Sequence, residues 1–147
     1  MGLEEELGLF LKDRAEHVEQ VITPALHKGR VVVLDRYYYS TAAYQGARGA
    51  NPEEILDENE KFAPLPDLVL LLDLDPTLVT DRISGRGERP DLFEGLENLI
   101  EARRIFLSIH RPNLVRIDAN LPTEEVARHC VLAFSAALER KRSGRPH

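Results

Sequence analysis

The sequence lacks the features of a secreted, membrane-spanning or nucleic-acid-binding protein. Its single cysteine, Cys130, excludes an intrachain disulfide and fits a reducing cytoplasm. No apolar run approaches the roughly 18 residues that a membrane helix needs, and the first residues are acidic, unlike a secretory signal. Acidic residues outnumber Lys and Arg by 25 to 19, which argues against a basic nucleic-acid-binding face. We therefore expect a cytoplasmic protein with neither a membrane nor a nucleic acid as a partner.

The residues that are present are typical of one globular domain. The chain has 147 residues, of which 43% are hydrophobic and 30% are charged, enough for a single substantial core. We expect this domain to span residues 1–140 and to be followed by a disordered tail at 141–147.

The pattern of apolar residues predicts alternating helices and strands. Helical spacing from Leu3 to Leu26 predicts a long first helix that is kinked near Pro24 and ends at Gly29. Asn51, followed by a proline and two acids, has the pattern of a helix start. Continuous apolar runs predict buried strands at 31–34, 68–73 and 114–118, and we expect further helices at 40–45, 96–109, 124–138 and from Pro76. This order implies an α/β fold in which a parallel sheet carries helices on both faces.

Basic side chains gather locally in this acidic chain. Arg82, Arg86 and Arg89 lie close together, and Arg103 and Arg104 follow within the next predicted helix. A local cluster indicates a small anionic ligand rather than a polyanion. A solvated surface is the alternative interpretation, and we favour it for Arg103 and Arg104.

The segment Val31–Gly49 carries the strongest functional signal. Its predicted strand ends at Asp35 and Arg36, and hydroxyl and amide side chains follow in the next predicted helix. In an open α/β sheet, ligands bind at the carboxyl ends of the strands. A carboxylate, a guanidinium and several hydroxyls at that edge suit a phosphorylated ligand that also has a sugar and a base.

This segment resembles the thymidylate kinases. Asp35-Arg36-Tyr37, then Ser40-Thr41 and Tyr44-Gln45, match the order found in that family, and the resemblance extends from about Leu3 to Leu138. It implies a P-loop NTPase fold of the nucleoside monophosphate kinase type and the reaction of ATP with dTMP to give ADP and dTDP, in dTDP and dTTP biosynthesis. It also implies Mg²⁺ as a cofactor and a homodimer.

The resemblance assigns the base and sugar of dTMP to residues of two helices. Phe10 would stack on the thymine and Arg14 would hydrogen-bond its carbonyl, although Phe10 also fits the apolar stripe of its helix. Tyr44 would pack against the deoxyribose, while Thr41 and Gln45 would approach the edge of the pyrimidine.

The resemblance assigns the phosphate of dTMP and the reacting groups to other residues of the segment Val31–Gly49. Arg36 would clamp the phosphate of dTMP, for which the planar guanidinium is well suited. Asp35 would orient the reacting groups or a water bound to Mg²⁺. Arg48 is a further candidate for a phosphate contact.

The family also has a lid and an adenine site. The lid would lie at about 82–93, where glycines allow closure and Arg82, Arg86 and Arg89 would neutralise charge on the transferred phosphoryl group. A charged surface loop explains each of these arginines equally well. Asp118 and Ala119 match the turn that runs beside the adenine of ATP in the family.

One family feature has no match in the chain. The Gly-x-x-x-x-Gly-Lys-Ser/Thr loop that cradles the phosphates of ATP does not occur, so we expect the N-terminal strand–loop–helix unit to be missing. A catalytically inactive or truncated module that binds dTMP or forms dimers is therefore an alternative. A deoxynucleoside kinase is a third interpretation, which the spacing of Tyr44 and Gln45 fits less well.

Overall fold

A computed structural model describes residues 1–78 and 90–144 of the chain. For residues 90–94 it describes the backbone only. The chain divides into two compact units, and each is described by itself. The first comprises Met1–Leu65 with Arg104–Leu107, and the second comprises Pro66–Arg103 with Ser108–His147.

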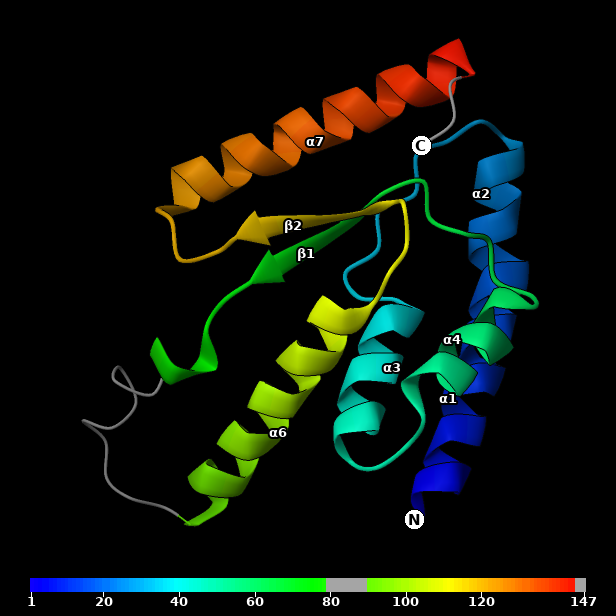
Figure 1. Cartoon of the computed structure of the whole chain (residues 1–147). Helices are drawn as coiled ribbons and strands as arrows, with labels where there is room; N and C mark the ends of the chain where they lie inside the picture. The colour runs from blue at the N-terminus through cyan, green and yellow to red at the C-terminus, as the bar shows by residue number, and fades with distance from the viewer. Residues whose placement is uncertain (79–89, 145–147) are drawn as a thin grey trace. The chain divides into compact units, whose positions relative to one another are not determined.

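The first unit begins with a long helix (Figure 1) that contains one π-helical stretch. It consists of α1 (Leu3–His17), a π-helical stretch η1 (Val18–Ile22) and α2 (Thr23–His27). Pro24 has no backbone N–H to donate, and its ring crowds the preceding turn, so the wider winding just before it has a local cause. The π-helical stretch lies just before Pro24, where a kink was predicted, and Gly29 follows the helix with the left-handed φ of 70° that suits glycine.

Residues 31–34 do not form the predicted buried strand. Val33 is 83% exposed, and across the part of the chain that is described no backbone hydrogen bond joins this segment to another. A strand is held by hydrogen bonds to a neighbour, so an apolar, β-branched run alone does not make one. The prediction of a strand here was wrong.

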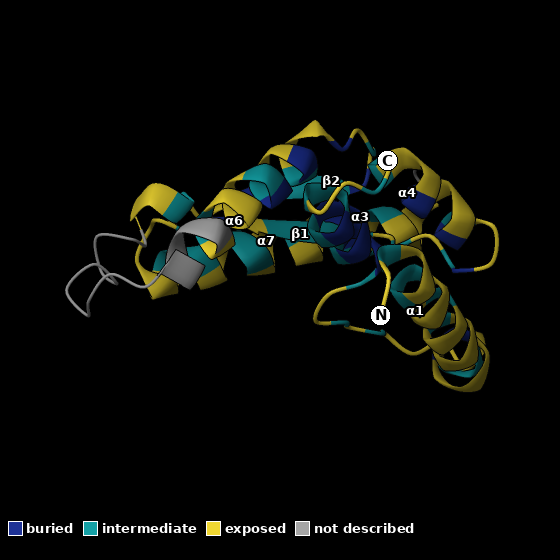
Figure 2. Cartoon of the chain, turned by 90° about the horizontal axis from the view of Figure 1, so that it is seen from below, coloured by how far each residue is buried: buried dark blue, intermediate teal, exposed yellow. Residues whose placement is uncertain are grey.

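Two packed helices, α3 (Tyr38–Ala47) and α4 (Pro52–Glu60), form the core of the first unit. Figure 2 shows the buried residues on these helices, whereas α1 has none. As predicted, Asn51 begins α4: its side-chain oxygen accepts hydrogen bonds from the backbone N–H groups of Glu53 and Glu54. Gly46 lets α3 approach closely, because a Cβ atom there would lie 2.9 Å from both Ile105 and Pro52.

The second unit contains a parallel pair of strands, β1 (Val69–Asp73) and β2 (Leu114–Asp118), which lie side by side (Figure 1). Val69 pairs with Leu114 and Asp73 with Asp118, so both strands end at the same edge. The α/β class and the parallel sheet are confirmed. Only two of the three predicted strands form among the residues described, and β1 is not fully buried, since Leu72 is 53% exposed.

The helices of the second unit are longer than predicted. Helix α6 (Pro90–Ser108) already includes residues 90–93, which were expected in the lid. Helix α7 (Thr123–Ser143), which contacts β2, includes residues 141–143 of the expected disordered tail and ends at Gly144, with a φ of 67°. Residues 82–89 and 145–147 lie outside the described ranges. Among the helices within residues 1–78 and 90–144, none has the length and apolarity needed to cross a membrane.

Candidate functional site

A line of functional side chains runs along one face of α1. Glu6, Phe10 and Arg14 are four residues apart, a spacing that places them above one another on a helix. At one end of this line, Arg14 Nη2 donates a hydrogen bond to Thr41 Oγ1 of α3 at 3.2 Å. The Arg14 guanidinium carbon also lies 5.0 Å from the centre of the Tyr37 ring. The structure therefore brings together Arg14 and Thr41, as predicted for one binding site.

Arg14 still has a donor to offer. Its Nε is buried and has no hydrogen-bond partner within the described parts of the chain. Burial lowers the pKa of Arg14, but a guanidinium remains charged at neutral pH. A buried, unsatisfied N–H is costly. Arg14 therefore carries an unsatisfied donor close to Thr41.

The other end of the line is a carboxylate that the sequence analysis missed. Glu6 Oε1 accepts a hydrogen bond from Gln45 Nε2 at 3.0 Å, and Glu6 Oε2 accepts one from Arg48 Nη1 at 2.6 Å. The hydrogen bond from Arg48 is the main cause that holds the pKa of Glu6 below its ordinary value. The predicted residues Gln45 and Arg48 thus share one partner. The only signal for Glu6 in the sequence was its position four residues before Phe10.

A cavity of about 160 Å³ lies beside the middle of α1. Phe10 and Thr41 line it, together with other side chains of α1 and α4. Phe10 is 40% exposed, so it is not the core residue that its apolar stripe also allowed. The Phe10 ring is therefore accessible to a ligand.

Arg36, which lies shortly before α3, has an unusual backbone conformation. Its φ is 67°, in the left-handed region that residues other than glycine rarely occupy. Its guanidinium carbon lies 5.0 Å from the centre of the Tyr44 ring, and that ring meets Phe106 edge-on at 6.0 Å between centres. The preceding residue, Asp35, is exposed. Strained conformations of this kind concentrate at functional sites.

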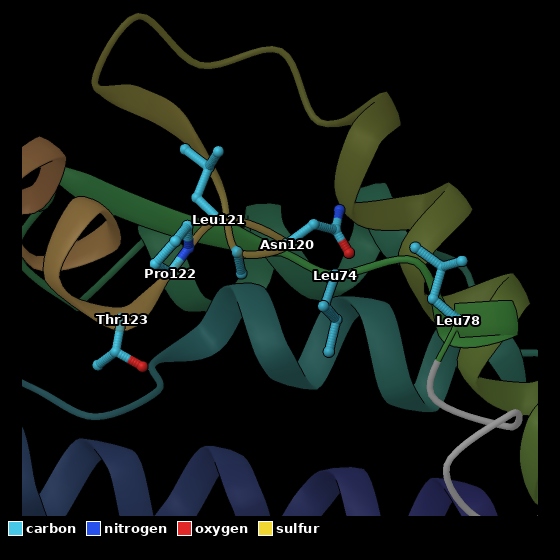
Figure 3. Close-up of a pocket in the computed structure, with 7 residues that line it drawn as sticks. Leu74, Leu78, Asn120, Leu121, Pro122 and Thr123 are labelled. Atoms are coloured by element: carbon cyan, nitrogen blue, oxygen red, sulfur yellow. The ribbon is translucent and has the colours of Figure 1, made fainter.

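A second candidate site follows the strands of the second unit. A groove of about 650 Å³ is lined by Leu74 and Leu78 after β1 and by the turn from Ala119 to Thr123 after β2 (Figure 3). Ala119, predicted to lie beside the adenine of ATP, is one of the lining residues. Asp118 is not, because its carboxylate turns back to accept hydrogen bonds from the backbone and side-chain amides of Asn120.

Asp73, the last residue of β1, is a buried carboxylate. Its side chain is only 5% exposed and pairs with two arginines: Arg103 Nε lies 2.8 Å from Oδ1, and Arg116 Nε lies 2.8 Å from Oδ2. The hydrogen bond from Arg103, and then that from Arg116, lower the pKa of Asp73. The interpretation of Arg103 as solvated surface was wrong. The Asp73 carbonyl oxygen also accepts the Ala119 N–H at 2.9 Å, which joins the two strand ends.

Three predicted residues cannot be placed. Arg82, Arg86 and Arg89 lie outside the described residues. Elsewhere in the chain, the residues that are described contain no group of three or more His, Cys, Asp or Glu side chains that could hold a metal ion. A metal held mainly by water and phosphate oxygens needs only one or two carboxylates, so the exposed Asp35 fits that kind of site.

The chain is similar to known proteins over almost its whole length. A family model described as Thymidylate kinase matches residues 2–130. A thymidylate kinase of Akkermansia muciniphila is 51% identical over 135 residues, which cover 92% of this chain and 65% of that protein. Thymidylate kinases of Xanthomonas euvesicatoria pv. vesicatoria and Xanthomonas campestris pv. campestris (strain B100) are 43% and 44% identical over 147 and 148 aligned residues. The match with each covers 100% of this chain and 65% of the relative.

Proposed function

The chain belongs to the thymidylate kinase family, and on this premise we propose that it serves the transfer of a phosphoryl group from ATP to dTMP, which yields ADP and dTDP. The product enters dTDP and dTTP biosynthesis. One observation carries the proposal: the side chains that the family resemblance assigns to dTMP lie together along α1 and α3. The matched relatives are longer, since the chain spans 65% of their length.

The thymine is held between α1 and α3. Phe10 stacks on the ring at the cavity, and Arg14 donates its free Nε–H or a neighbouring N–H to the carbonyl. Thr41 and Gln45 face the pyrimidine edge, because both lie on the side of α3 that contacts α1. Tyr44 packs against the deoxyribose, where a 2′-hydroxyl would crowd its ring.

The phosphate of dTMP is held by Arg36. Its guanidinium is already ordered by Tyr44, so less side-chain entropy is lost when the phosphate binds. Arg48 contributes a second positive charge after it exchanges part of its contact with Glu6. Phosphoryl transfer between two nucleotides needs no protein nucleophile, so positioning and charge neutralisation are the tasks of these residues.

The base of ATP occupies the groove after β1 and β2. Its leucines suit the faces of an adenine, and Ala119 and the neighbouring backbone suit its polar edge. By the family resemblance, Arg82, Arg86 and Arg89 neutralise charge on the transferred phosphoryl group. Asp35 would be the residue that holds Mg²⁺, whose positive charge would neutralise the phosphates. The sequence has no Gly-x-x-x-x-Gly-Lys-Ser/Thr motif, so the residues assigned here do not include a cradle for the phosphates of ATP.

The rest of the proposal follows from family membership. The fold is that of a P-loop NTPase of the nucleoside monophosphate kinase type, with helices on both faces of the sheet. The protein works as a homodimer in the cytoplasm. Sedimentation equilibrium would measure the dimer directly.

Isothermal titration calorimetry of the purified chain with dTMP tests the acceptor site. We expect one dTMP per chain, with thymidine much weaker because it lacks the phosphate. A protein that binds thymidine as tightly as dTMP would point instead to a deoxynucleoside kinase. Formation of dTDP from ATP and dTMP then separates a kinase from a non-catalytic dTMP-binding module, which the family match does not favour.

A further inference from the structure

The contact between Glu6 and Gln45 determines more than the packing of α1 on α3. We infer that Glu6 is a positioning residue, whose carboxylate turns the Gln45 side chain so that its amide oxygen faces the ligand. This orientation makes the site accept the N3–H of thymine and reject cytosine. The inference rests on the proposed function, because it takes the ligand to be dTMP.

The orientation of the Gln45 amide follows from the chemistry of its partner. An ionised carboxylate only accepts hydrogen bonds, whereas an amide has one donating and one accepting end. Gln45 Nε2 lies 3.0 Å from Glu6 Oε1, and the opposite orientation would set two oxygens against each other. Glu6 is ionised at neutral pH, since the hydrogen bond from Arg48 lowers its pKa.

Burial makes this orientation hard to reverse. Gln45 is only 7% exposed, so water competes little with the hydrogen bond to Glu6. Arg48 holds the other oxygen of the same carboxylate at 2.6 Å and so limits its rotation. In the parts of the chain that are described, the Gln45 oxygen accepts no hydrogen bond and is left for a ligand.

Two polar groups of opposite kind then lie near Thr41, which lines the cavity. Arg14, hydrogen-bonded to Thr41, offers a donor, and Gln45, one helical turn after Thr41, offers an acceptor. Thymine presents a carbonyl at position 4 and an N–H at position 3, which match this pair. Cytosine presents an amino group and a lone pair at these positions, so both contacts would be donor against donor or acceptor against acceptor. Such mismatches leave buried polar groups unpaired and are strongly unfavourable.

The decisive variant is Glu6→Gln, which keeps the size of the side chain and removes the requirement for a donor. Its amide can present either end to Gln45, so Gln45 is free to turn. Calorimetric titration with dTMP and dCMP measures the selectivity. We expect the intact chain to prefer dTMP by roughly 10-fold or more, and Glu6→Gln to reduce this preference to about threefold or less. Glu5→Gln, the same change at the exposed neighbouring position, should leave the preference unchanged.

A double variant guards against a general loss of structure. In Glu6→Gln combined with Gln45→Glu, the amide and the carboxylate exchange places, and the carboxylate at position 45 keeps an oxygen for N3–H. We expect this pair to recover the preference for dTMP that Glu6→Gln loses, which a mere effect on folding would not do.

The results separate the inference from the proposed function. If the unmodified chain binds dTMP selectively and Glu6→Gln is equally selective, the role of Glu6 is wrong and the proposed function stands. If the unmodified chain binds no dTMP, the proposed function fails and the role of Glu6 fails with it.

Discussion

The Arg36 guanidinium carbon lies 5.0 Å from the centre of the Tyr44 ring, and the Arg36 backbone has a φ of 67°. The left-handed conformation costs a residue with a Cβ atom roughly 1–2 kcal/mol. The contact with Tyr44 keeps the side chain at the candidate phosphate site despite this cost. A strained backbone and an ordered cation at the same residue support the proposal of a pre-arranged anion site.

Two substitutions at Arg36 separate binding from strain. Arg36→Ala and Arg36→Gly both remove the guanidinium, so each should weaken dTMP binding by about 1.5–3 kcal/mol, the range for hydrogen bonds to charged groups. Glycine tolerates the positive φ, so Arg36→Gly should be more stable to urea than Arg36→Ala by about 1 kcal/mol. Unchanged dTMP affinity in both variants would remove Arg36 from the phosphate site.

Asp73 should make the stability of the protein depend on acid pH. Its pKa is lowered in the folded state by Arg103 and Arg116, so its stabilising effect is complete above its unfolded pKa of about 3.9. That effect is lost as the pH falls from there through the folded pKa. The Tm of the unmodified chain should exceed that of Asp73→Asn at pH 6, and the difference should shrink below about pH 4. Asp57→Asn, at an exposed position, is the control and should show no comparable difference at pH 6.

Gly46 tests how closely α3 is packed. A Cβ atom there would lie 2.9 Å from Ile105 Cδ1 and from Pro52 Cγ. Gly46→Ala should therefore destabilise the chain by roughly 1–3 kcal/mol in urea unfolding. Gly8 lies in α1 with no atom near its added Cβ, so Gly8→Ala should be neutral or stabilising by up to about 1 kcal/mol. Equal effects of the two substitutions would contradict the packing argument.

The groove after the strands can be blocked without touching the dTMP residues. Ala119→Trp fills part of the groove of about 650 Å³ and keeps the backbone N–H that bonds to Asp73. Saturation-transfer NMR measures the binding of adenosine. We expect that binding to weaken at least about 10-fold while dTMP affinity stays the same. Ala127→Trp places the same ring at an exposed position of α7 and is the matched control. A loss of adenosine binding in both variants would show that the effect is not specific to the groove.

Local sequence was sufficient wherever the cause of a structure lies within a few residues. The cap at Asn51 and the stop at Gly29 depend on neighbours along the chain. The same holds for Phe10 and Arg14, which helical spacing alone places on one face. The resemblance to thymidylate kinases, confirmed by the family match, also lay in short local motifs.

Only the tertiary structure decided which distant groups meet. Within the described residues, it left Val31 and Val33 exposed and without a backbone hydrogen bond to another segment, because a strand depends on a partner that local sequence does not name. It joined Glu6 to Gln45 and Arg48, and it gave the buried Asp73 the partners Arg103 and Arg116 from far along the chain. Charged groups are stable in such places only when an opposite charge arrives from another segment, and the path of the backbone determines which one does.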